Sequence, residues 1–140
     1  MKNCFFLVLL LTFSTLAFCQ TTKLKKKIFY VDGVAELNLK SCPFMHGLHQ
    51  SCLVKSAKTD QPLFSTYVVN AGQSGFIVDI SFVDFDLELR AEGMLFKKLF
   101  TRMYELGVVN EDGSVNEENA RKFARAFDIR KERKIIIIEE

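Results

Sequence analysis

The hydrophobic pattern of this chain changes its period at Gly93, and this change limits the possible folds more than any other feature. Before Gly93, apolar and polar residues alternate, which is typical of β-strands with one buried face. After Gly93, apolar residues recur every three to four positions, which is typical of amphipathic helices. Strands followed by helices predict an α+β domain. We expect an antiparallel sheet of about five strands with two C-terminal helices packed on it.

The strands are predicted from β-prone runs bounded by turn residues. The clearest turn is Asp32-Gly33, because these residues readily adopt the positive φ angles of a tight hairpin. Pro62 has no backbone N–H, so it belongs at a strand start or at a sheet edge. The predicted strands cover residues 28–31, 34–39, 53–57, 63–69 and 76–89.

The last of these runs, 76–89, contains a change of phase. Apolar residues occupy even positions up to Phe82 and odd positions from Val83 onward. A shift of one residue moves every later side chain to the other face of a strand. We therefore expect a β-bulge near Phe82-Val83 within one long strand.

Two helices are predicted after Gly93. The first has its apolar stripe within 95–106 and ends at Gly107. The second begins at Asn116, a favoured capping residue, with acidic residues in its first turn. The later run 135–138 contains four isoleucines and is expected to form a short buried or edge strand.

Residues 1–19 have the features of a cleavable signal peptide. Lys2 precedes an apolar run that ends at Phe18, and this run is shorter than the ~20 residues that a membrane-spanning helix needs. Cleavage is expected before Gln20, which predicts a secreted or periplasmic protein. The alternative is a membrane-anchored lipoprotein acylated at Cys19. Residues 20–27 are expected to be a flexible basic leader, and 28–140 a single α+β domain.

The charge balance argues against some partners. The chain has 19 Lys and Arg against 17 Asp and Glu, so no strong field favours nucleic acid or an anionic membrane. We expect no nucleic-acid partner, and a membrane association only if Cys19 is lipidated.

The loop 41–52 contains both cysteines and both histidines that follow residue 19. In an oxidising compartment, Cys42 and Cys52 are expected to form a disulfide, with no cofactor bound. The alternative is a zinc or copper site, for which four nitrogen and sulfur ligands are suited. Its ligands would be Cys42, His46, His49 and Cys52. A disulfide and a thiolate metal site exclude each other.

A second candidate site is a row of carboxylates. Asp84, Asp86 and Glu88 would share one face of the predicted strand. Such a row could hold calcium or provide an acid–base pair, but it is more often the solvated face of a half-buried strand.

Several segments resemble small exported proteins of Bacteroidota. The resemblance implies export and provides no activity or site residues. The shared segments are Cys19-Gln20, Ile28-Phe29-Tyr30-Val31-Asp32-Gly33, Asn110-Glu111-Asp112-Gly113 and Asn116-Glu117-Glu118-Asn119.

The sequence therefore favours an exported, non-enzymatic binding or interaction protein. Its ligand, a protein or a small molecule, would bind the sheet edge or the loops. The alternatives are a periplasmic metal-binding protein that uses the 41–52 loop and an enzyme that uses the carboxylate row.

The intact mass of the exported protein tests these expectations together. We expect the mass of a chain that begins at Gln20, lowered by two hydrogens because Cys42 and Cys52 are oxidised. A bound metal with reduced thiols would support the metal site instead, and an added lipid would support acylation of Cys19. A full-length chain with reduced thiols would contradict the prediction of export.

Overall fold

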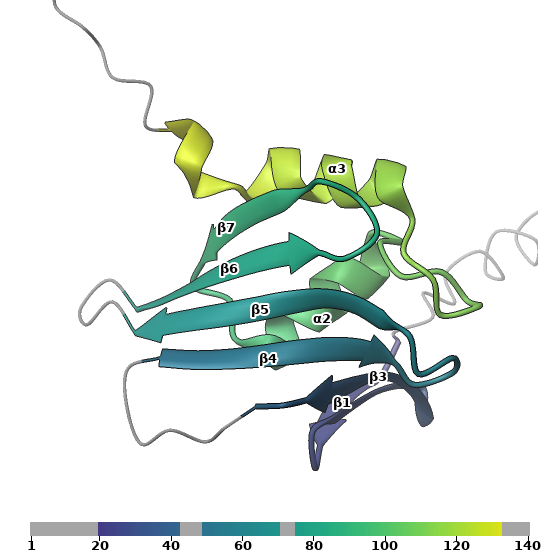
Figure 1. Ribbon diagram of the computed structural model, residues 1–140. Coiled ribbons are helices and arrows are strands. Elements are labelled where there is room, and N and C mark those ends of the chain that lie inside the picture. Colours follow the sequence, from purple (N-terminus) through teal and green to yellow (C-terminus); the bar gives the residue numbers. More distant parts are fainter. Residues whose placement is uncertain (1–19, 43–48, 71–74, 133–140) are drawn as a thin grey trace, which may run out of the picture.

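The computed structural model of this chain describes residues 20–42, 49–70 and 75–132, which form one antiparallel sheet and two α-helices (Figure 1). The strands follow one another across the sheet in chain order, so each pairs with its sequence neighbours. The strands are β1 (Thr22–Lys25), β2 (Ile28–Val31), β3 (Val34–Lys40), β4 (His49–Ser56), β5 (Pro62–Asn70), β6 (Phe76–Phe82) and β7 (Glu88–Glu92). The helices are α2 (Phe96–Glu105), α3 (Glu117–Phe127) and the short 3₁₀ helix η3 (Ile129–Glu132).

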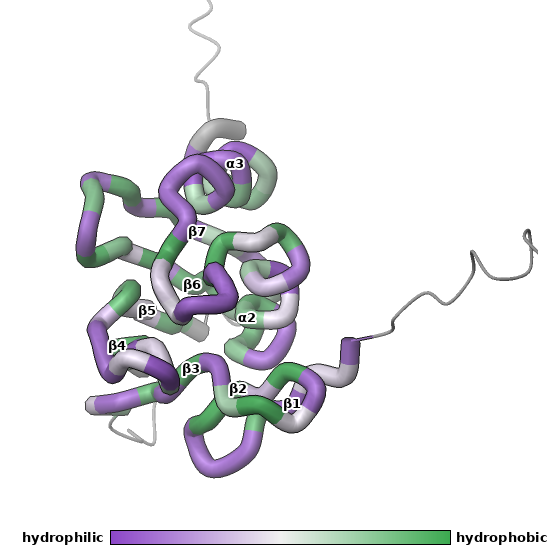
Figure 2. The backbone as a smooth tube through the Cα atoms, turned by 90° about the vertical axis from the view of Figure 1, so that its right-hand side faces the viewer, coloured by the Kyte–Doolittle hydropathy of each residue, from purple (hydrophilic) through white to green (hydrophobic). Residues whose placement is uncertain are grey.

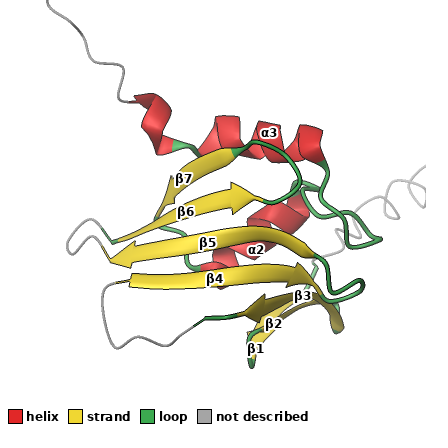
Figure 3. Cartoon of the chain, viewed as in Figure 1, coloured by secondary structure: helices red, strands yellow, loops and turns green. Residues whose placement is uncertain are grey.

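The sheet is strongly curled. Viewed nearly end-on, its strands run in an arc from β7 to β1, and α2 lies inside the arc (Figure 2). Helix α3 lies along β7 at one end of the sheet, and β1 lies at the opposite end (Figure 3). The sheet therefore leaves two edge strands, β1 and β7.

Helix α2 fills the concave face of the sheet with aromatic side chains. Phe100 is fully buried, and its ring lies 5.6 Å from that of Phe29 on β2 and 6.1 Å from that of Phe64 on β5. Phe96 stacks on Phe100 at 5.7 Å. One side chain of α2 thus contacts strands three positions apart in the sheet, and this packing maintains the curl.

The α+β prediction with an antiparallel sheet is confirmed, but the sheet has seven strands and not five. One reason is that residues 22–25 form β1, whereas the sequence predicted a flexible leader over 20–27. The hairpin from β1 to β2 turns at Lys26 and Lys27, whose φ angles are +50° and +67°. Lysine rarely adopts this conformation, so the sequence has no turn signal at this point.

The other reason is that the predicted long strand 76–89 consists of two strands. Strand β6 ends at Phe82, and the chain turns so that the backbone N–H of Phe82 donates to the carbonyl oxygen of Leu87 at 3.1 Å. Ser81 then pairs with Glu88 as β7 returns. The change of phase comes from this turn, and the prediction of a β-bulge at Phe82-Val83 is wrong.

Other local predictions are confirmed. Asp32 and Gly33 have φ angles of +48° and +84° and connect β2 to β3. The Asn116 side chain accepts a hydrogen bond from the backbone N–H of Asn119, which caps α3 as expected. The predicted strand at 135–138 lies outside the described residues.

Phe100→Ala tests the role of α2 in the core. Because Phe→Ala substitutions in cores typically cost ~3–5 kcal/mol, we expect a loss of that size in the free energy of unfolding. Leu106→Ala is the control, since Leu106 is 47% exposed at the end of the same helix. Urea unfolding of both variants measures the difference, and equal small losses would contradict the central role of Phe100.

Candidate functional site

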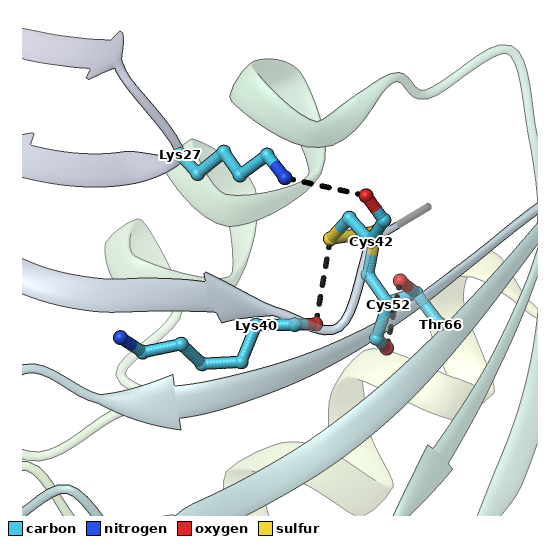
Figure 4. Close-up of a disulfide and its surroundings, with 5 residues drawn as sticks. All are labelled: Lys27, Lys40, Cys42, Cys52 and Thr66. Carbon is cyan, nitrogen blue, oxygen red and sulfur yellow. Dashed lines mark hydrogen bonds between the residues drawn. A yellow bond between two sulfur atoms is a disulfide. The ribbon is translucent and has the colours of Figure 1, made fainter. Parts of the chain in front are cut away.

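Cys42 and Cys52 form a disulfide, as one of the two alternatives predicted (Figure 4). Both cysteines are buried in the core, and Lys27 donates a hydrogen bond of 3.2 Å to the carbonyl oxygen of Cys42. The bond connects the end of β3 to β4 across a sequence separation of 10. Closing a loop of this size contributes ~2–3 kcal/mol to stability by restricting the unfolded chain. The bond is thus a structural element of the sheet.

The alternative metal site requires Cys42, His46, His49 and Cys52. In the structure the two sulfur atoms are bonded to each other, so they are not the thiolate ligands that this site needs. His46 lies outside the described residues, and His49 begins β4. Within the described ranges, no group of three or more His, Cys, Asp or Glu residues could hold a metal ion.

The predicted carboxylate row is not a single strand face. Asp84 and Asp86 lie exposed in the turn between β6 and β7, and Glu88 is the first residue of β7. Glu88 instead accepts a weak hydrogen bond of 3.4 Å from the hydroxyl of Ser81.

Polar side chains line a pocket of about 290 Å³ on the convex face of β5, β6 and β7. The strand register places Tyr67, Asp79 and Arg90 side by side. The Arg90 guanidinium donates to both carboxylate oxygens of Asp79, at 2.6 and 2.8 Å. This pairing raises the pKa of Arg90, mainly through the hydrogen bonds with Asp79. The charges of this pocket are thus largely satisfied within it.

An ion pair between a buried carboxylate and a half-buried lysine lies elsewhere, between β3 and the β4–β5 turn. The Glu36 side chain is 4% exposed, and its Oε2 lies 2.8 Å from Nζ of Lys58. Lys58 also donates to the carbonyl oxygen of Glu111 at 2.7 Å, which connects the sheet to the α2–α3 segment. Burial, together with the charge of Glu36, raises the pKa of Tyr104. This pair connects elements and opens into no described pocket.

The edge strand β7 is partly covered by Asp128, the C-cap of α3, and by Arg130 of η3. Asp128 Oδ1 accepts from the backbone N–H of Arg90 at 3.2 Å, and Arg130 donates to the backbone carbonyl of Glu88. Arg130 and Asp128 also pair with each other at 3.0 Å. These contacts provide partners for two outward backbone groups of β7, the N–H of Arg90 and the carbonyl of Glu88.

The pKa of Asp128 is lowered from its ordinary value of 3.8. Burial, the largest influence, would raise it, but hydrogen bonds from Arg130 and from the Arg90 backbone together outweigh burial. A carboxyl with a lowered folded-state pKa stabilises the fold above its unfolded pKa. That contribution disappears as the pH falls through the folded pKa.

The other edge strand, β1, is open within the described part of the chain. The backbone N–H of Asp32 donates to the carbonyl oxygen of Thr21, so the backbone groups of Thr21 point toward β2. Every second residue of an antiparallel strand points the same way, so the backbone groups of Lys23 and Lys25 also point toward β2. By the alternation of an antiparallel ladder, Thr22 and Leu24 direct theirs away from the sheet. No backbone group of a described residue outside β2 pairs with β1.

Sequence reasoning missed both edges. Asp128 and Arg130 are far from β7 in sequence, and no local pattern shows their contact with it. For β1, the alternation of Thr22 and Leu24 with lysines was the available signal, because it has the period of a strand.

No protein-family model, curated protein or solved structure matches this chain. Among the described helices, none has the length and apolar character to span a bilayer.

Asp128→Ala tests the contacts of Asp128 at the β7 edge. Near neutral pH we expect it to lower the free energy of unfolding by about 1–3 kcal/mol, because hydrogen bonds to a charged group are lost. The loss should shrink as the pH falls from the unfolded-state pKa of Asp128 through its lowered folded-state pKa, because the wild-type carboxylate becomes protonated there. Asp84→Ala is the control, since Asp84 is an exposed turn residue. Equal effects of the two substitutions at every pH would contradict the role of Asp128.

Proposed function

We propose that this chain is an exported, non-enzymatic binding protein that recognises a partner protein through the open edge of β1. The observation that carries the proposal is the difference between the two edges. Asp128 and Arg130 bond to two outward backbone groups of β7, whereas no described residue pairs with the outward backbone groups of Thr22 and Leu24. An exposed strand edge binds an extended segment by adding it as a further strand.

The ion pairs described above support binding in preference to catalysis. Asp79 pairs with Arg90, and Glu36 pairs with Lys58. Each pair connects neighbouring strands or joins a strand to a turn. Side chains engaged in this way stiffen the sheet that presents β1.

The disulfide supports the proposed export. Disulfides persist in oxidising compartments, and the Cys42–Cys52 bond is buried in the core. It stabilises the β3–β4 connection, which lies two strands from the open edge. A rigid sheet near the edge has less conformational entropy to lose when a partner binds, so the entropic cost of binding is lower.

Site-specific photo-crosslinking in the producing cells tests this function. A photoreactive amino acid replaces Thr21, which is exposed beside β1, or Arg125, which is exposed on α3. We expect a discrete protein adduct from position 21 and none from position 125. The adduct should disappear in Leu24→Pro, which removes the outward N–H, and persist in Leu24→Val, which keeps it.

Thermal unfolding of both Leu24 variants confirms that they fold. An adduct that forms equally from both positions, or that persists in a folded Leu24→Pro protein, would contradict binding at this edge. Absence of any adduct from position 21 would contradict it as well.

A further inference from the structure

We propose that the partner segment is an extended acidic peptide, which joins the sheet beside β1 and directs carboxylates to both of its faces. This inference rests on the proposed function and names the chemistry of the partner. It follows from the hollows on either side of β1 and from the charges that line them.

A strand added beside β1 would have surface for its side chains on both faces. On the convex side, a hollow of about 420 Å³ is lined by Thr21, Lys23, Lys25, Tyr30 and Gly33. On the concave side, a groove of about 580 Å³ lies between Thr22 and the surface of α2. Successive side chains of a strand point to opposite faces, so an added segment would place them alternately on these two sides.

Both sides are lined by cations. The convex hollow contains Lys23 and Lys25, which are exposed. The concave groove contains Lys97, Lys98 and Arg102 of α2, and Glu105 is its one acidic lining residue. Arg102 pairs with Glu105 at 2.9 Å, which leaves Lys97 and Lys98 as the exposed charges that this pair does not neutralise. The two sides therefore favour an acidic segment, although the whole chain is nearly balanced in charge.

The same lysines argue against a second copy of this chain as the occupant. Pairing two β1 edges would place Lys23 and Lys25 close to the same residues of the other copy. Like charges on adjacent strands are destabilising. Edge lysines are also a common protection against unspecific pairing, and here they discriminate, because they repel basic strands and attract acidic ones.

Binding of a defined peptide tests this inference. The probe is a fluorescent ten-residue peptide in which pairs of glutamates alternate with pairs of threonines, so that an added strand directs carboxylates to both faces of the sheet. The controls are the same peptide with lysine in place of glutamate, and one with proline at alternate threonines. We expect only the first to bind, with increased protection of the Thr22 and Leu24 amides from hydrogen exchange.

Two kinds of variant separate recognition of the acidic charge from addition of the peptide as a strand beside β1. Lys23→Gln/Lys25→Gln should weaken binding about three- to tenfold, as expected for two exposed ion pairs. Lys122→Gln/Arg125→Gln removes two exposed charges of α3 and should change it less than about twofold. Leu24→Pro should abolish binding, and Leu24→Val should not.

The inference is overturned if the lysine peptide binds equally well, if neither peptide binds, or if Leu24→Pro has no effect. Sedimentation that shows a dimer dissociated by Leu24→Pro would assign the edge to a second copy and would also overturn it. If the acidic peptide fails while the position-21 crosslink persists, the proposed function stands and only the partner chemistry is wrong. If both fail, the edge is not a binding site.

Discussion

A curled sheet that does not close into a barrel leaves two edges, and the rest of this structure is arranged around that constraint. The unpaired backbone groups of an edge strand attract any extended segment, so proteins cover them, charge them or use them. In this chain the two ends are treated differently. Asp128 and Arg130 bond to two outward backbone groups of β7, whereas β1 is bordered by lysines and, among the described residues, is paired with β2 alone. This asymmetry is the basis of the proposed function.

The core explains why the sheet curves between its two edges. Phe100 contacts Phe29 and Phe64, so α2 holds the middle of the sheet in its curve. The disulfide ties β3 to β4 within that curve. Helix α3 then lies against β7, and the chain continues directly into Asp128 and Arg130, which bond to the backbone of this edge. Helix α2 contacts β1 from the concave side, where the hydroxyl groups of Thr101 and Thr22 form a hydrogen bond of 3.0 Å. That contact supports the edge strand without engaging the outward backbone groups of Thr22 and Leu24.

How much of the fold and of the candidate site could be predicted depends on how far apart in sequence the interacting residues lie. Asp32-Gly33 and the Asn116 cap are local signals, and the structure confirms both. The Lys26-Lys27 turn was missed because lysine rarely has a positive φ, so β1 was interpreted as a leader.

The phase change after Phe82 was detected, but a bulge and a short turn change the phase in the same way. Only the pairing of Ser81 with Glu88 distinguishes them. The disulfide followed from two cysteines in one short loop. The ion pairs Glu36–Lys58 and Asp79–Arg90 form between residues distant in sequence, so no local pattern predicts them. Two of the three carboxylates predicted to share a strand face lie in a turn.

Amide hydrogen exchange in the unliganded protein tests the difference between the edges most directly. The account predicts that the Lys23 and Lys25 amides are protected by β2 and the Arg90 amide by Asp128, while the Thr22 and Leu24 amides exchange nearly as fast as in an unfolded chain. Protection of Thr22 and Leu24 equal to that of Lys23 and Lys25 would mean that the β1 edge is already covered, and would contradict the account.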